Sequence, residues 1–275
     1  MTVSHTTIDA GGLRFDALVA GPDDGEIVLL LHGFPQSAAM WQPQLEALAG
    51  AGYRAVAFDQ RGYSPGARPT EVDQYRVGHL VDDALAVAGP EPFHVVGHDW
   101  GAVVAWHLAA KHPERLRTLT ALSVPHPLAF ATALASPGSD QRAQSSYVGF
   151  FRMTDVAEET LLGGGLEMML KASAYPLDIG ERVAAMSRPG ALTGALNWYR
   201  AINFDVVRNV HGITVPTLYI WSTGDVALAR EGAEATARHV EGPYRFEVLQ
   251  GVSHWIPEEV PEELNRLLLE HIRAQ

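Results

Sequence analysis

The sequence contains no cysteine among its 275 residues, which excludes disulfide bonds, thiolate metal sites and a cysteine nucleophile. It also has no stretch of about 18 apolar residues, the length that a membrane-spanning helix needs. Its first residues, MTVSHTTIDAGG, lack the basic segment and apolar run of a secretory signal. We therefore expect a soluble, cytoplasmic protein that does not associate with membranes.

Positively charged residues are fewer than negatively charged ones. The 20 Lys and Arg against 32 Asp and Glu give a formal net charge of −12, so the surface is expected to repel nucleic acid and anionic membrane surfaces. Hydrophobic residues make up 47% of the chain and charged residues 19%, which excludes an intrinsically disordered protein. This composition favours a folded protein that acts on small neutral molecules.

Short apolar runs alternate with helix-like patterns over the first 125 residues. The runs at 26–31, 53–58, 93–96 and 116–122 predict strands, and helices are expected over 77–85 and 100–111. This alternation is typical of a mostly parallel sheet with helices on both faces. Ahead of it, Gly11 and Gly12 predict an antiparallel hairpin at the sheet edge, because such a dipeptide supplies positive φ angles.

The pattern changes after residue 125. Helix-like segments with Gly and Pro punctuation follow, including Gly163, Gly164 and Gly165, and no strand is expected before 217. Strands at 217–221 and 244–249 and a helix at 261–273 complete the chain. The predicted fold class is α/β, a mostly parallel sheet with helices on both faces and an inserted helical lid. We assign 1–125 and 210–275 to the core and 126–209 to the lid.

Asp99 lies between a predicted strand and a predicted helix, with Gly97 and Gly101 two residues away on either side. Small residues at these positions are typical of a nucleophile elbow, a strained turn that exposes its central side chain above the sheet. Here an aspartate occupies the position where serine is usual. The alternative is that Asp99 only caps the following helix, which is a frequent role of aspartate.

Five motifs together resemble those of the α/β-hydrolase-fold epoxide hydrolases, and the likeness covers essentially the whole chain. They are HGFPQS at 32–37, DQRGYS at 59–64, GHDWGA at 97–102, NWYRA at 197–201 and GVSHW at 251–255. HGFP and GHDWG are each shared with related dehalogenases. The resemblance implies that Asp99 is a carboxylate nucleophile. It would form an alkyl ester with a carbonyl that water can attack, whereas a seryl ether would have none.

The same resemblance assigns partners to Asp99. His254, in the loop after the last predicted strand, is the implied general base, and Asp225 would orient and stabilise its ring. The other role open to Asp225 is to cap a helix that begins at Val226.

The HGFP loop resembles the family's oxyanion loop. The backbone N–H groups of Phe34 and Trp100 would hold the negative charge that develops on Asp99, and a cis peptide bond is implied before Pro35. We expect His32 to hold this loop by hydrogen bonds.

Two tyrosines of the predicted lid would protonate the oxygen of an opening epoxide. Tyr199 matches the family's second lid tyrosine and Tyr147 resembles the first, although each could instead be an aromatic residue packed in the lid. A phenol with a pKa near 10 can protonate an alkoxide whose conjugate acid resembles water, at about 15.7. The indole N–H of Trp100 could also serve a leaving halide. The residues expected to line an apolar substrate pocket are Phe34, Trp100, Phe130, Phe150, Phe151 and Trp255.

Other polar residues are assigned to the scaffold. His94 and His98 have the spacing of metal ligands on a helix, but they lie on a strand and at the elbow, so we expect neither a shared face nor a metal site. Asp59 and Arg61 are expected to pair with each other. No cofactor is expected either, since there is no glycine-rich phosphate-binding loop.

The function implied is a cofactor-independent epoxide hydrolase that forms vicinal diols from small apolar epoxides and water, through an ester on Asp99. The alternative enzyme is a haloalkane or haloacid dehalogenase with the same aspartate, histidine and acid. An ordinary esterase is disfavoured because the elbow lacks serine. A binding protein with this fold and no turnover is a further alternative, against which the complete triad argues.

Overall fold

The computed structural model describes residues 2–203, 210 and 212–274. Within these residues one eight-stranded sheet runs in the order β1-β2-β4-β3-β5-β6-β7-β8. β1 pairs antiparallel with β2 and β2 with β4, and all other neighbours are parallel. The strands are β1 Ser4–Ala10, β2 Leu13–Ala20, β3 Ile27–Leu31, β4 Arg54–Phe58, β5 Phe93–His98, β6 Leu116–Leu122, β7 Thr217–Gly224 and β8 Tyr244–Ser253.

The predicted strands are confirmed with small shifts at their ends, and so is the hairpin at the sheet edge. Gly11 and Gly12 take φ angles of 58° and 79°, in the left-handed region that glycine enters at little cost. β1 and β2 therefore pair in register from Ser4 with Val19 to Ala10 with Leu13.

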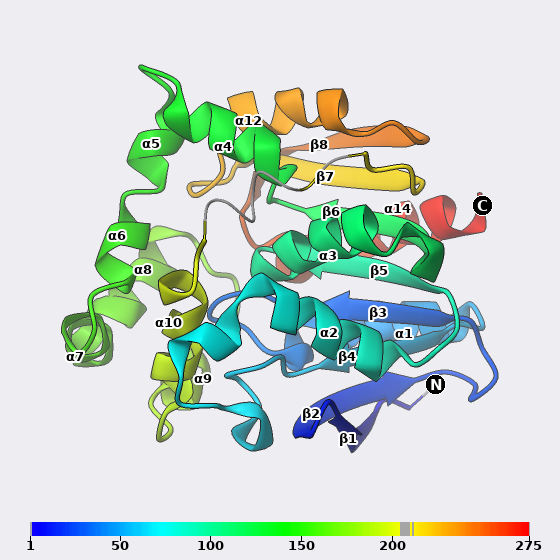
Figure 1. Cartoon of the computed structure of the whole chain (residues 1–275), viewed down its shortest axis with the longest axis horizontal. Helices are drawn as coiled ribbons and strands as arrows, with labels where there is room; N and C mark the ends of the chain where they lie inside the picture. The colour runs from blue at the N-terminus through cyan, green and yellow to red at the C-terminus, as the bar shows by residue number, and fades with distance from the viewer. Residues whose placement is uncertain (1, 204–209, 211, 275) are drawn as a thin grey trace.

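Helices cover both faces of the sheet (Figure 1). Successive residues of a strand point to opposite faces, so β3 supplies Leu29 and Leu31 to one core and Val28 and Leu30 to the other. The first core also receives side chains of α2 and α3, and the second those of α1 and α14. These helices are α1 Gln42–Gly50, α2 Val77–Ala88, α3 Trp100–Lys111 and α14 Pro261–Arg273, with the shorter α12 Arg230–Ala235 and α13 Ile256–Glu259.

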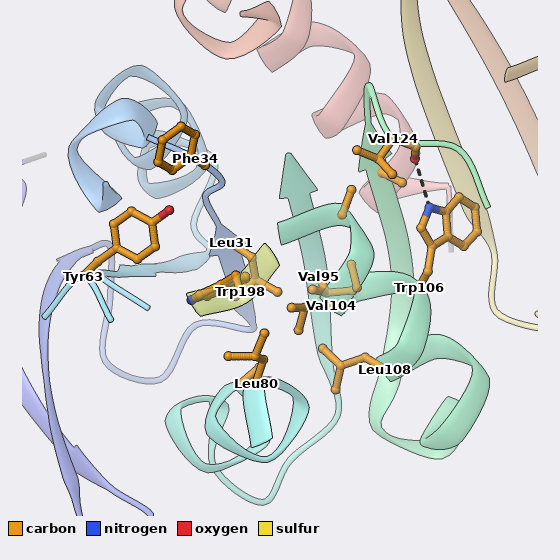
Figure 2. Packing of buried hydrophobic residues seen from close by; sticks show 14 of the residues in the cluster. Leu31, Phe34, Tyr63, Leu80, Val95, Val104, Trp106, Leu108, Val124 and Trp198 are labelled. Atoms are coloured by element: carbon orange, nitrogen blue, oxygen red, sulfur yellow. Dashed lines mark hydrogen bonds between the residues drawn. The ribbon is translucent and has the colours of Figure 1, made fainter. Parts of the chain in front are cut away.

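Figure 2 shows the first core, which lies between the sheet and the helices α2 and α3. Leu80 of α2 and Val104 of α3 pack there with Val95 of β5. Trp106, fully buried, donates its indole N–H to the oxygen of Val124 at 3.1 Å, so its one polar group is satisfied. This packing fixes α3, the helix that begins directly after Asp99.

Between β6 and β7 the described residues form helices and no strand beyond a single bridge of Ile213 with Val240. We call this helical segment the lid, and in Figure 1 α6–α10 lie beyond one end of the sheet. The division into a core and a lid of 126–209 stays a prediction, and residue 209 lies outside the described residues. The helices of this segment are α4 Pro127–Ala135, α5 Asp140–Gln144, α6 Tyr147–Phe151, α7 Val156–Thr160, α8 Leu166–Ala172, α9 Ile179–Met186 and α10 Ala191–Arg200.

The run of three glycines in this segment interrupts the helices, as expected. It lies in the turn Leu161–Gly165, between α7 and α8. Gly164 has a φ of 111° and produces a kink there. Among the described residues no helix combines the length and apolar character needed to cross a membrane.

Two tryptophan indole groups join this helical segment to the core by hydrogen bonds. Trp198 of α10 donates its Nε1–H to the oxygen of Arg61 at 2.7 Å, and Trp255 donates its own to the oxygen of Ser173 at 2.9 Å. Both bonds join segments far apart in the sequence. The helices are thereby held over the loops that follow the parallel strands.

The predicted pairing of Asp59 with Arg61 is wrong. Arg61 instead forms a bidentate ion pair with Asp83 of α2, with both N–O distances 2.7 Å. The two side chains are only 8% and 4% exposed. Asp59 accepts a hydrogen bond from the backbone N–H of Ala38 at 2.7 Å. A planar guanidinium pairs best with a carboxylate whose two oxygens each accept one of its N–H groups, and Asp83 has this orientation.

Removal of the Arg61 guanidinium should destabilise the fold strongly, since it leaves Asp83 buried and unpaired. We expect Arg61→Met to lower the free energy of unfolding by about 3–5 kcal/mol in urea denaturation. Arg14→Met is the matched control, because the ion pair of Arg14 with Asp9 is largely exposed, and it should leave the free energy almost unchanged. Equal effects of the two substitutions would contradict the stabilising role of the buried pair of Arg61 and Asp83.

Candidate active site

Asp99 occupies a sharp turn between β5 and α3, with φ 53° and ψ −121°. Neighbouring main-chain atoms leave no room for a side chain at positions 97 and 101. A Cβ on Gly97 would lie 2.2 Å from the oxygen of Gly101, and one on Gly101 would lie 2.0 Å from the oxygen of Leu31. The turn therefore needs both glycines. The Asp99 side chain makes no N-cap hydrogen bond of the usual kind, although the N–H of Trp100, the first residue of α3, hydrogen-bonds its carboxylate.

The carboxylate of Asp99 is held by backbone donors. The N–H of Phe34 donates to Oδ1 at 2.8 Å, and the N–H of Trp100 also hydrogen-bonds the carboxylate. Gly33, which the sequence analysis did not single out, allows this approach, since a Cβ there would lie 2.1 Å from Oδ1. The cis peptide bond between Phe34 and Pro35 is confirmed.

His32 holds the HGFP loop by hydrogen bonds, as predicted. The backbone N–H of Gln60 donates to His32 Nε2 at 3.0 Å, and Nδ1 lies 3.0 Å from the oxygen of Gly33. The first bond makes Nε2 the acceptor and assigns the proton to Nδ1. Burial lowers the pKa of His32 to about 3, so the ring is neutral.

His254 lies between the two carboxylates. Its Nδ1 is 2.8 Å from Oδ2 of Asp225, and its Nε2 is 3.7 Å from Oδ2 of Asp99. The other oxygen of Asp225 accepts the N–H groups of Ala227 and Leu228 at 2.8 and 2.9 Å. No helix begins at Val226, because α12 starts only at Arg230, so these donors belong to a turn. Asp225 thus contacts the histidine and holds its own turn at once.

The pKa values follow from burial and from these charges. Burial raises the pKa of the Asp99 carboxyl, while His254 and the N–H groups of Phe34 and Trp100 act in the opposite direction. Burial alone would lower the pKa of His254, but Asp225 and Asp99 outweigh it and raise the pKa to about 9. Near neutral pH the site therefore contains an imidazolium between two carboxylates.

His94 and His98 both lie on β5 and face the same side of the sheet, contrary to the expectation, because residues four apart in a strand share a face. They have different partners. His94 Nδ1 lies 2.8 Å from Thr118 Oγ1, and His98 Nε2 lies 2.9 Å from the oxygen of His254. Ser123 donates its hydroxyl to the same oxygen at 3.2 Å. Over the described part of the chain no group of three or more His, Cys, Asp or Glu is arranged to bind a metal ion.

Two cavities meet at Asp99, with volumes of about 430 and 380 Å³. Asp99, Tyr147 and Tyr199 line both of them, and the centroids of the two tyrosine rings are 6.3 Å apart. All six residues expected in the pocket line one cavity or the other. The first includes Trp100 and Phe130, and the second Phe34, Phe150, Phe151 and Trp255.

The two tyrosines remain protonated well above neutral pH. Burial raises the pKa of both hydroxyls, and the negative charge of Asp99 raises them further. A side-chain hydrogen bond with Trp100 acts in the opposite direction on Tyr199. Both phenols are therefore neutral donors that border the same space as the carboxylate.

Comparison with known proteins identifies the same architecture elsewhere. Residues 26–261 match the family model described as the alpha/beta hydrolase fold, which confirms the predicted fold class. The chain is 37% identical to an AB hydrolase superfamily protein of Bacillus subtilis, over 98% of this chain and 97% of that protein. It is 31% identical to epoxide hydrolase A of Mycobacterium tuberculosis, over 96% of each. The crystal structure of epoxide hydrolase A from Mycobacterium thermoresistibile superposes with a TM-score of 0.85 at 28% identity, covering 99% of this chain and 98% of that one.

The raised pKa of His254 should make its contribution to stability depend on pH. The folded protein binds the His254 proton more tightly than the unfolded chain, in which the pKa is near 6.5. The stabilisation is therefore complete below pH 6.5 and is lost as pH rises through about 9. We expect the difference in free energy of unfolding between wild type and His254→Gln to shrink between about pH 6 and about pH 10.

Urea denaturation at the two pH values measures this difference. The control repeats the His254→Gln comparison in a protein that also carries Asp225→Asn, which removes a charge that raises the His254 pKa. The change in the free-energy difference between the two pH values should then be smaller. A difference that is the same at both pH values in the unmodified background would contradict the charged site.

Proposed function

This chain belongs to the α/β-hydrolase fold family, among its epoxide hydrolases, and we propose that it converts epoxides to vicinal diols through a covalent ester on Asp99. One observation carries the proposal: two neutral phenols, Tyr199 buried and Tyr147 half-buried, border the same two cavities as a buried carboxylate. Opening an epoxide requires a nucleophile for the ring carbon and a proton donor for the ring oxygen. Asp99 and the pair of Tyr147 and Tyr199 supply these two groups.

In the first step Asp99 Oδ2 attacks a ring carbon. Oδ2 is the free oxygen for this purpose, since Oδ1 already accepts the N–H of Phe34. The carbon–oxygen bond of the ring breaks, and the leaving oxygen takes a proton from Tyr147 or Tyr199. A phenol is a stronger acid than the alcohol that forms, so the transfer is favourable. The Asp99 carboxylate loses its negative charge as the ester forms. The imidazolium of His254, which lines the same cavity as both tyrosines, returns a proton to the phenolate and is left neutral for the second step.

In the second step water attacks the carbonyl carbon of the ester. His254 Nε2 takes the proton of that water, and Asp225 stabilises the imidazolium that results. The oxyanion of the tetrahedral intermediate forms on Oδ1, where the N–H groups of Phe34 and Trp100 stabilise it. The bond between the carbonyl carbon and the alkyl oxygen then breaks, and the leaving oxygen takes the proton of the new Asp99 carboxyl group. The diol leaves, and the water oxygen remains in the Asp99 carboxylate.

The cavities define the substrate further. Aromatic and aliphatic side chains dominate both linings, so the substituents of the epoxide are expected to be apolar. Because Asp99 lies where the two cavities meet, one substituent can occupy each cavity while the ring lies against the carboxylate. No cofactor takes part in this reaction.

The two lid tyrosines are expected to share the activation of the ring oxygen. Tyr147→Phe and Tyr199→Phe should each slow ring opening by about 10² to 10³, the usual effect of losing one such donor, and the double variant should almost abolish it. Rapid-quench measurement of ester formation separates this step from hydrolysis. Tyr244→Phe is the control, since Tyr244 lies on β8 and is absent from both cavity linings. If both single variants open the ring at the wild-type rate, the tyrosines are not the proton donors.

His254→Gln should open the epoxide and then stop at the ester. A carboxylate can attack without help from a base, whereas hydrolysis of the ester needs an activated water. Mass spectrometry of the stalled protein should show the peptide that contains Asp99 heavier by the whole mass of the epoxide, because ring opening expels nothing.

The same variant distinguishes the reaction from that of a dehalogenase. A haloalkane would add only its alkyl group and lose the halide. An adduct from the haloalkane alone would favour dehalogenation, and a folded protein with an adduct from neither substrate would remove Asp99 as nucleophile.

A further inference from the structure

A buried glutamine of the lid contacts the turn that holds the triad acid. Gln141 lies on α5, and its side chain is fully buried. Its Nε2 donates to the oxygen of Ala227 at 2.8 Å, and its Oε1 accepts the N–H of Ala229 at 2.9 Å. A further bond runs from Nε2 to Ser145 Oγ at 2.9 Å. The amide is thus satisfied by two backbone groups of one turn and by its own helix.

The turn that Gln141 contacts fixes the Asp225 carboxylate. Its N–H groups at Ala227 and Leu228 both donate to Oδ1 of Asp225, which leaves Oδ2 directed to His254. From the sheet side, Trp221 donates its indole N–H to the oxygen of Leu228 at 3.0 Å. The turn is therefore held by a tryptophan of β7 on one side and by Gln141 on the other.

The same turn also borders the substrate space. Ala227 lines both cavities, and Leu228 lines the larger one. A substrate in either cavity therefore lies against the segment that carries the acid. Without Gln141, the lid would lose its two hydrogen bonds to this segment.

We propose that Gln141 is a positioning residue for Asp225, through which the lid fixes the acid of the triad for the hydrolysis step. The proposal rests on the proposed epoxide hydrolysis and makes it more specific. Asp225 acts on His254, and His254 is needed only after the ester has formed. Asp99 is oriented by the elbow and by the N–H of Phe34, none of which contacts Gln141. Loss of Gln141 should therefore slow hydrolysis of the ester and spare ring opening.

Gln141→Met tests this, since methionine has a similar length and volume but makes neither hydrogen bond. Single-turnover rapid quench with an epoxide substrate should show ring opening within twofold of wild type. Hydrolysis of the ester should be slower by roughly 10-fold, on the order of the loss of a well-oriented hydrogen bond. The ester should accumulate in the steady state. Arg142→Met, at the exposed neighbouring position of α5, should change neither rate.

The steady-state constants provide a readout that a merely structural role would not produce. When hydrolysis limits turnover, kcat and KM fall together and kcat/KM stays constant, because kcat/KM depends only on the steps up to ester formation. A variant that is partly unfolded would lower kcat and kcat/KM equally. If Gln141→Met does not fold, Gln141→Asn keeps an amide that is one methylene too short for both bonds, and the same pattern is expected.

The results separate the two proposals. A wild-type protein that forms no ester with an epoxide would remove the proposed function. A wild-type protein that forms and hydrolyses the ester, together with Gln141 variants that do so at wild-type rates, would overturn the role of Gln141 alone. Equal slowing of both steps would overturn it as well, since the effect would then not be specific to Asp225.

Discussion

The close contact between the start of α3 and the ends of β3 and β5 is the constraint on which the site depends. Main-chain atoms touch at Gly97 and Gly101, where a Cβ would overlap carbonyl oxygens. The turn between them has no room to relax, so Asp99 takes a left-handed φ that a side chain rarely adopts. Its carboxylate is thereby brought to the N–H of Phe34.

The helical segment between β6 and β7 is part of the site as well as its cover. Tyr147 and Tyr199 come from it, and so does Gln141, which contacts the turn beside Asp225. The indole of Trp198 fixes the helix that carries Tyr199 to the loop after β4. Because each of these contacts is a directed hydrogen bond, a shift of the segment would displace the phenols and the acid together. The proposed proton donation and ester hydrolysis would therefore both depend on one arrangement of the molecule.

Much of this could be predicted from the sequence, because periodic patterns and short motifs report local geometry. The helix at 100–111 and the elbow at Asp99 depend on residues close in the chain. Distant pairs in which one partner lies outside the motifs were missed or wrong. The partner of Arg61 is Asp83, 22 positions away, and spacing alone favoured the nearer Asp59. Gln141 belongs to no motif, and its contacts with the turn are 86 and 88 positions away, so only the folded chain reveals them.

The charges of the site favour the two proposed steps in a fixed order. Before reaction, Asp99 and Asp225 together hold His254 protonated, with a pKa of about 9, so the histidine cannot act as a base while the carboxylate is free to attack. Formation of the ester removes the charge of Asp99, and with it one of the interactions that raise the pKa of His254. The pKa then falls, the ring releases its proton more readily, and the histidine becomes a base when an ester is there to be hydrolysed. In the proposed mechanism the charge of Asp99 thus controls the basicity of His254.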